Sequence, residues 1–135
     1  VKALTEGLAG NEMTRVMGVM NGTCNYILTR MESAGLPYAE VFEEARGLGY
    51  LEADPRLDVD GIDAGHKLAL LALVAFGVHV DPREIPAEGI DAVSAFDVRA
   101  AAELGYVIKS LAIAERGDDG VRLRVHPTLV PRGHV

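Results

Sequence analysis

The final third of the sequence has the pattern of a β-hairpin. Residues 106–114 alternate in polarity and are rich in β-branched side chains, and a second such run contains Val121, Leu123 and Val125. Between the two runs lies Gly117-Asp118-Asp119-Gly120, a turn sequence of the Asp-Gly kind. The chain is therefore expected to contain a sheet, and the residues before the hairpin have to supply the elements that cover it.

Those earlier residues read mainly as helices. Apolar residues at helical spacing predict helices at residues 1–9, 25–33, 37–46 and 92–104. An apolar run at residues 13–20 predicts a buried strand, and residues 47–60, dense in Gly, Pro and acids, predict a loop. Asp60 is expected to cap a long apolar helix after that loop. The order of elements predicts an α+β domain, with a mixed β-sheet or an antiparallel one covered by helices.

Composition limits the classes of partner. The 135 residues are 49% hydrophobic, enough for one globular unit, and the net charge of −7 has the wrong sign for nucleic acid. The apolar stretch at residues 68–80 is interrupted by Gly77 and His79 and is shorter than the roughly 20 residues that span a bilayer. With one cysteine and no signal-peptide pattern, a cytoplasmic protein without membrane partners is expected.

Both ends of the sequence lie within patterned segments. Val1 opens inside a helical pattern, and Val135 follows directly on an extended run. Natural domains usually begin and end in polar, flexible segments. Residues 1–135 are therefore expected to be one domain that is truncated at both ends.

An acidic segment between residues 52 and 67 carries the richest chemistry. Its charged residues are Glu52, Asp54, Asp58, Asp60, Asp63 and Lys67, with Arg56 among them. A solvated acidic surface, a cation site and a site for an ammonium-bearing substrate would each explain this cluster.

The cation interpretation fails on spacing. Residues 58–61 resemble the centre of a calcium-binding loop, but with Gly61 at the sixth position Arg56 and Lys67 would fall on ligand positions. Two cationic side chains cannot replace oxygen ligands. The four histidines are scattered, with no pair at zinc-ligand spacing, so no metal is expected.

Asp63 and Lys67 lie four residues apart on the predicted long helix. Such a pair is commonly a weak contact on an open surface. The helix is otherwise strongly apolar, however, so Lys67 can also lie at the edge of a buried face, where desolvation and Asp63 would shift its pKa in opposite directions. That second arrangement is how proteins prepare a lysine for proton transfer. Both interpretations stay open at this point.

A longer pattern runs through the same segment. Residues 45–67 read Ala-Arg-Gly-Leu-Gly-Tyr-Leu-Glu-Ala-Asp-Pro-Arg-Leu-Asp-Val-Asp-Gly-Ile-Asp-Ala-Gly-His-Lys. This run closely resembles the signature of homoserine dehydrogenases. The resemblance continues through residues 18–28, 87–90 and 126–131, so it covers effectively the whole chain. Leu51 and Cys24 depart from the residues usual in the family, which affects details of packing rather than the assignment.

The resemblance implies an activity. Homoserine dehydrogenases interconvert L-homoserine and L-aspartate 4-semialdehyde with NAD(P), on the pathway to threonine, methionine and isoleucine. The sequence has no G-x-G-x-x-G after a strand, so the resemblance implies that NAD(P) is bound mainly by a preceding domain that is absent here. It also implies that the domain forms a homodimer and binds a small-molecule substrate.

The resemblance further assigns roles to individual residues. Asp63 and Lys67 become the catalytic pair, with Lys67 or a lysine of the missing half as the proton relay. The substrate-binding residues would be Thr23, Gly49, Tyr50, Glu52 and Asp58, with the two acids on the substrate's amino and hydroxyl side. Asn21 and Gly22 would offer backbone donors to the cofactor. Thr23 would otherwise be a helix N-cap, and Tyr50 would otherwise fill the core.

Two other functions compete with this assignment. The chain could be the substrate domain of another amino-acid-related dehydrogenase, or a non-catalytic oligomerisation module. An acylating semialdehyde dehydrogenase is disfavoured, because Cys24 has no evident partner base in the sequence.

Overall fold

The computed structural model describes residues 1–134, and its sheet has three strands in the order β1-β2-β3. β2 (Tyr106–Gly117) and β3 (Gly120–Pro131) pair along their whole length, and β1 (Arg15–Gly18) pairs antiparallel with the distal half of β2. The predicted hairpin and the α+β class are confirmed. Of the two kinds of sheet left open, the strands form the antiparallel one, with an isolated parallel bridge between Ala87 and Val125.

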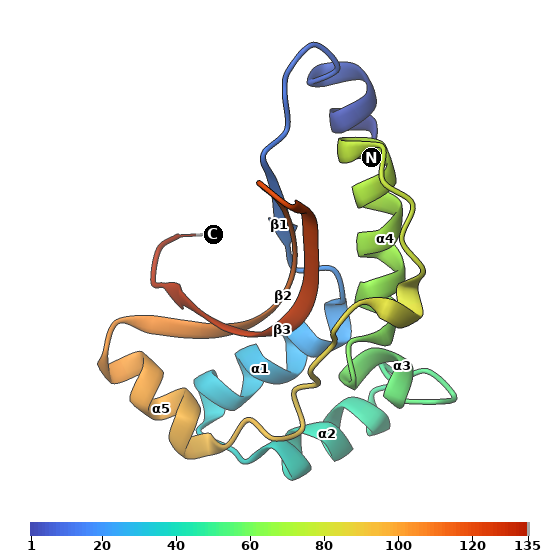
Figure 1. The fold of residues 1–135 in the computed structure, drawn as a ribbon. Helices are drawn as coiled ribbons and strands as arrows, with labels where there is room; N and C mark the ends of the chain where they lie inside the picture. Colours follow the sequence, from blue (N-terminus) through green and yellow to red (C-terminus); the bar gives the residue numbers. More distant parts are fainter. Residues whose placement is uncertain (135) are drawn as a thin grey trace.

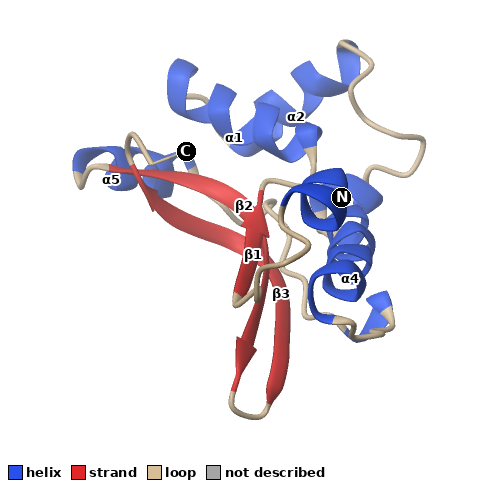
Figure 2. Ribbon diagram, turned by 90° about the horizontal axis from the view of Figure 1, so that it is seen from above, coloured by secondary structure: helices blue, strands red, loops and turns tan. Residues whose placement is uncertain are grey.

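The helices lie on one side of this sheet. β2 and β3 bend together into a curved hairpin, and α1 (Gly22–Ala34) and α4 (Ile62–Phe76) lie along its convex side (Figure 1). α2 (Tyr38–Gly47) packs behind α1, and α5 (Ala95–Glu103) lies at the end of the hairpin that carries the start of β2. Seen from above, the turn of the hairpin extends away from the helical layer (Figure 2).

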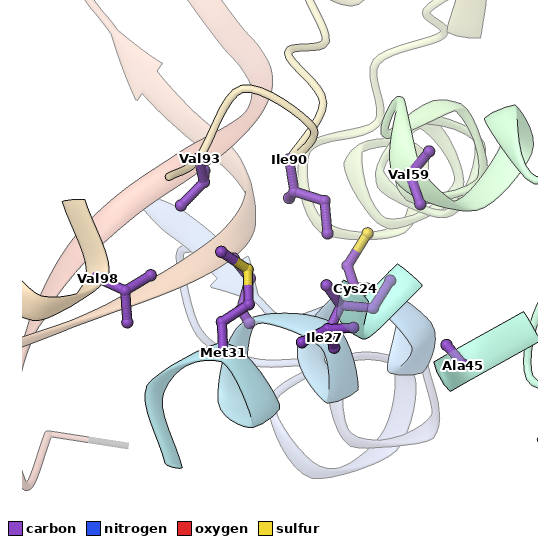
Figure 3. Packing of buried hydrophobic residues seen from close by; sticks show 10 residues of the cluster. Cys24, Ile27, Met31, Ala45, Val59, Ile90, Val93 and Val98 are labelled. Atoms are coloured by element: carbon purple, nitrogen blue, oxygen red, sulfur yellow. The ribbon is translucent and has the colours of Figure 1, made fainter. Parts of the chain in front are cut away.

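Two apolar clusters hold the layers together. The first surrounds α1, whose buried residues Cys24, Ile27 and Met31 face side chains from the helices and loops around it (Figure 3). The second joins α4 to the sheet. It contains Ala64, Leu68, Ala69, Ile85, Ala112, Ala114 and Val125. The many alanines in the second cluster let α4 approach the strands closely, and α4 also contacts β1.

Several sequence predictions need correction at the N-terminal end. The helix expected at residues 1–9 is a single π-helical turn, η1 (Ala3–Gly7). The strand expected at residues 13–20 is shorter and is not buried, since Met17 is 54% exposed. Met17 pairs with Ile113, on the sheet face opposite the one that packs on α4, and β1 is an edge strand.

The segment before α4 is also more ordered than expected. The predicted loop at residues 47–60 contains a short helix, α3 (Arg56–Val59). Gly61, not Asp60, is the N-cap of α4. Gly61 has a φ of 82° and lies so close to β3 that a Cβ atom would come within 3.1 Å of Val125 Cγ1. A glycine is needed there both for the backbone conformation and for the close approach.

The remaining elements follow the sequence closely. α1 ends at Gly35 in the left-handed conformation, as its glycine predicted. α5 begins at Ser94 with a capping box that Ser94 and Asp97 form together. A short 3-10 turn, η2 (Pro82–Glu84), follows α4. No helix among residues 1–134 is long and apolar enough to cross a membrane.

Candidate active site

The turn between β1 and α1 carries a buried asparagine. Asn21 is 7% exposed and is the N-cap of α1, because its Oδ1 accepts a hydrogen bond from the backbone N–H of Cys24 at 2.8 Å. Its Nδ2 donates to Asp58 Oδ1 at 2.9 Å and to Asp63 Oδ2 at 3.1 Å. Both amide hydrogens are therefore directed at carboxylates on two other elements, α3 and α4.

Asp58 links α3 to the acidic loop. Its side chain is buried, and its Oδ2 accepts a hydrogen bond from the backbone N–H of Glu52 at 3.2 Å. With Asn21 on Oδ1, each carboxylate oxygen has a protein donor. A buried charge is tolerated only when it is hydrogen-bonded, so Asp58 fixes the loop at Glu52 relative to the start of α1.

Lys67 stands one turn after Asp63 on α4, as their spacing predicts. Lys67 Nζ donates to Asp63 Oδ2 at 2.7 Å and to the backbone carbonyl of Met20 at 2.9 Å. An ammonium group has three hydrogens, so one remains for another acceptor. The Lys67 side chain is 50% exposed and that of Asp63 is 34% exposed, so a dissolved molecule can reach both.

The surroundings of Asp63 act on its pKa in both directions. Partial burial raises the pKa, but hydrogen bonds from Lys67 and Asn21 and the charge of Lys67 outweigh burial and hold it below its ordinary value. Asp63 is therefore ionised in neutral solution. Its Oδ1 has no hydrogen-bond partner among the residues that the structure describes. A free acceptor thus lies beside the free hydrogen of Lys67.

Thr23 and Tyr50 meet at the side of this cluster. Thr23 Oγ1 donates to the backbone carbonyl of Tyr50 at 3.0 Å, which joins the start of α1 to the loop after α2. The Tyr50 ring packs edge-on against Tyr26, with centroids 5.0 Å apart, yet Tyr50 stays 50% exposed. Asn21 caps α1, so the helix-cap alternative for Thr23 is wrong, and Tyr50 does not fill the core.

The other predicted site residues lie in the same region. Glu52 is exposed, and Gly49 adopts a φ of 75° where the chain leaves α2. Gly22 is exposed and negative in φ, and a Cβ atom there would meet nothing within 4 Å. Gly49 therefore has a conformational reason to be glycine. No contact among residues 1–134 requires a glycine at Gly22.

Cys24 lies beneath the cluster and is not a nucleophile. It is 2% exposed, and its Sγ donates to the backbone carbonyl of Asp58 at 3.1 Å. Burial, followed by the nearby charges of Asp58, Asp63 and Asp60, raises the pKa of Cys24 to about 12. The protonated thiol fits poorly with the acylating dehydrogenase that the sequence already disfavoured.

The structure thus gathers residues from four separate segments. One continuous network of hydrogen bonds connects Glu52, Asp58, Asn21, Asp63 and Lys67. Sequence reasoning identified these residues but missed the bridging amide of Asn21 and the carbonyl of Met20. The signal available for Asn21 was its position just before a helix, where Asn is a preferred cap. Among residues 1–134, no group of three or more His, Cys, Asp or Glu is placed to hold a metal.

An arrangement of this kind suits a polar substrate with both donors and acceptors. An ionised carboxylate and an ammonium group, each with one free position, can accept from a hydroxyl and donate to it at the same place. The additional acid at Glu52 offers an acceptor for a cationic group. The network places this chemistry at the junction of β1, α1, α3 and α4.

Comparison with known proteins identifies the family. The homoserine dehydrogenase from Synechocystis is 49% identical over 99% of this chain, and that from Pseudomonas aeruginosa is 47% identical over 97%. The chain spans about a third of these relatives, 32% and 30% of their lengths.

Solved structures show the same similarity. The homoserine dehydrogenase from Thiobacillus denitrificans superposes with a TM-score of 0.93 at 49% identity, over 96% of this chain and 30% of that one. A hyperthermophilic archaeal homoserine dehydrogenase in complex with NADPH superposes with a TM-score of 0.77 at 30% identity, over 98% and 36%. The family described as homoserine dehydrogenase matches residues 1–135, and the chain therefore belongs to the homoserine dehydrogenase family.

Proposed function

We propose that residues 1–135 form the substrate-binding and catalytic part of an enzyme that interconverts L-homoserine and L-aspartate 4-semialdehyde with NAD(P). The observation that carries the proposal is the accessible pair of Asp63 and Lys67, which the buried network holds in place. An ion pair on an open surface would not be hydrogen-bonded to the buried Asn21 or to the Met20 carbonyl. These contacts favour the catalytic interpretation over the solvated one.

Oxidation of homoserine removes a hydride from the alcohol carbon and a proton from its hydroxyl group. NAD(P), when bound, accepts the hydride. The free hydrogen of Lys67 and the free oxygen of Asp63 would hold the hydroxyl group. Its proton would pass to a lysine in the neutral amine form, either Lys67 after it has given up its free hydrogen or a lysine outside these residues. The acids at Glu52 and Asp58 would attract the ammonium group, with Thr23, Gly49 and Tyr50 around the substrate.

The cofactor would be held mainly by a nucleotide-binding domain outside this chain. The described residues contain no glycine-rich turn between a strand and a helix of the kind that holds a pyrophosphate, and at the N-terminus of α1 the N–H of Cys24 is already bonded to the side-chain oxygen of Asn21. Gly22 would make a smaller contact with the cofactor in this chain, since its exposed backbone can be approached closely. The 135 residues alone are expected to be inactive.

The substrate assignment can be tested in the longer enzyme, meaning a chain that joins these residues to a nucleotide-binding domain. We expect homoserine-dependent reduction of NADP⁺ or NAD⁺. We also expect a loss of kcat/KM on the order of 10²-fold with 4-hydroxybutyrate, which lacks the ammonium group that the acids would bind. Equal rates with the two alcohols would favour the alternative of a different dehydrogenase. No reaction with either would favour a non-catalytic module.

The domain is also proposed to form a two-fold homodimer through its strands. By register, Met17, Val107, Leu111, Ile113 and Val130 share the sheet face opposite the one that packs on α4, and Met17 is exposed. An edge strand with an exposed apolar side chain is a common site of association. Sedimentation at tens of micromolar protein checks this proposal. A monomer in the longer enzyme would contradict it.

A further inference from the structure

Among residues 1–134, the amide of Asn21 is the one group that hydrogen-bonds both the buried Asp58 and the accessible Asp63. Asp58 and Asp63 lie 37 and 42 residues along the chain from Asn21, on different helices, and each accepts one hydrogen from the same nitrogen. Two carboxylates that share a donor must lie no farther apart than the two hydrogen bonds together reach. Without that donor, like charges at such a separation repel each other and favour uptake of a proton by one of them.

We propose that Asn21 is a positioning residue that sets the spacing and orientation of the Asp58 and Asp63 carboxylates for the substrate. The inference rests on the proposed function. The amide of Asn21 bonds Oδ2 of Asp63 together with Lys67, so Oδ1 is the oxygen of Asp63 that has no hydrogen-bond partner among the described residues. The same amide donates to Oδ1 of Asp58, whose Oδ2 accepts from the backbone N–H of Glu52. Through these bonds Asn21 sets the position of the acidic loop relative to α4.

The side chain of Asn21 is fully committed to this task. Its Oδ1 caps α1, both of its amide hydrogens are used, and it is more than nine-tenths buried. The residue therefore acts through its neighbours and not by touching the substrate. Only an asparagine combines the short acceptor that caps a helix with two donors at this length.

Capping and bridging can be separated by substitution in the longer enzyme. Asn21→Ser keeps a hydroxyl oxygen for the cap but removes the bridge. We expect a loss of kcat/KM of about 10-fold to 10²-fold, because small displacements of catalytic groups are costly. The melting temperature should also fall, because one oxygen of the buried Asp58 loses its donor. Ser94→Ala, which removes the exposed cap of α5, is the matched control and should lower stability while leaving activity unchanged.

A double-mutant cycle tests whether Asn21 acts through Asp63. In the presence of Asp63→Asn, the further change Asn21→Ser should cost little additional activity, because the carboxylate that it positions is already altered. Losses that simply multiply, or an Asn21→Ser variant within about twofold of the parent, would overturn the positioning role. If the parent oxidises homoserine while Asn21→Ser stays normal, the proposed function stands and only this inference fails.

Asn21→Asp provides a second variant of nearly the same shape. It keeps the cap but places a third acid against Asp58 and Asp63. The other titratable neighbours are Asp60, Lys67, His66 and the thiol of Cys24. We expect activity to be low at neutral pH and to recover in part as the pH falls, because a protonated carboxyl group can again donate one hydrogen bond. A purely structural residue would leave the shape of the pH profile unchanged, and that result would also overturn the inference.

A readout without substrate separates the inference from the proposed function altogether. In the 135-residue chain, carboxyl carbon NMR should show a higher pKa for Asp63 in Asn21→Ser than in the parent, because one of the hydrogen bonds that lower it is gone. An unchanged pKa would mean that the bridge is absent in solution, whatever the enzyme turns out to catalyse.

Discussion

The N-termini of α1 and α5 are both capped by a polar side chain, but the two caps differ in reach. At α5, Ser94 and Asp97 satisfy each other in a local capping box, and both are exposed. At α1, Asn21 is buried, and its amide extends to acids on two other helices. A cap with only local partners stabilises its own helix. A cap with distant partners also fixes how separate elements meet, which is what a site built from several segments requires.

The reactivity of a cysteine thiol should differ more between the N-termini of α1 and α5 than any other property. Burial and nearby acids raise the pKa of Cys24 to about 12 from an ordinary value of 9.0, so its thiolate is scarce at pH 8. A cysteine introduced as Ser94→Cys would be exposed at a helix N-terminus, where the thiol pKa is ordinary or lower. We expect alkylation at position 94 to be on the order of 10³-fold faster, as followed by peptide mass spectrometry. Comparable rates would show that the α1 end is open in solution.

Removal of Lys67 should have the next largest effect. If Lys67 holds or relays the hydroxyl proton, Lys67→Ala in the longer enzyme should lose turnover on the order of 10²-fold or more while remaining folded. Arg83→Ala is the matched control, because Arg83 forms a comparably short pair with Asp81, at 2.6 Å, but is 87% exposed. Its loss should leave steady-state homoserine oxidation unchanged. Near-normal turnover in Lys67→Ala would mean that Asp63 and Lys67 form an ordinary surface ion pair without a catalytic role.

Glu52 in the acidic loop is expected to affect substrate binding more than turnover. Glu52→Gln should raise the KM for homoserine by about 10-fold with a smaller change in kcat, because the proposed contact with the ammonium group exists in the ground and transition states alike. The backbone N–H of Glu52, which bonds Asp58, is unaffected by this change. Initial rates over a range of homoserine concentrations provide the measurement. A fall in kcat alone would instead place Glu52 at the reacting carbon.

The smallest effect is expected at the α5 end. Ser94→Ala removes one side of the capping box and should lower the free energy of unfolding by about 1 kcal/mol, as measured by urea denaturation. Activity should not change, since no hydrogen bond of the side chains at this cap reaches the site. A loss of activity at constant stability would mean that the two helix ends are coupled, contrary to the comparison.

Much of the fold could be predicted because its signals are local. The turn at residues 117–120 predicted the hairpin, and Gly35 predicted the end of α1. The short helix α3 was missed because residues 56–59 are too few to show helical periodicity. The exposure of β1 was missed because an apolar run does not reveal that its strand lies at the edge of the sheet.

For the site, the sequence by itself determined which charged residues are present and that Asp63 and Lys67 share a helix face, since a spacing of four residues is a property of the helix alone. It also carried the resemblance to homoserine dehydrogenases. Only the tertiary structure decided that Asn21 bridges Asp58 and Asp63 and that the Met20 carbonyl holds Lys67. Those contacts join residues about 40 positions apart, and they depend on how closely α4 packs on the sheet beside α1, which no local pattern specifies.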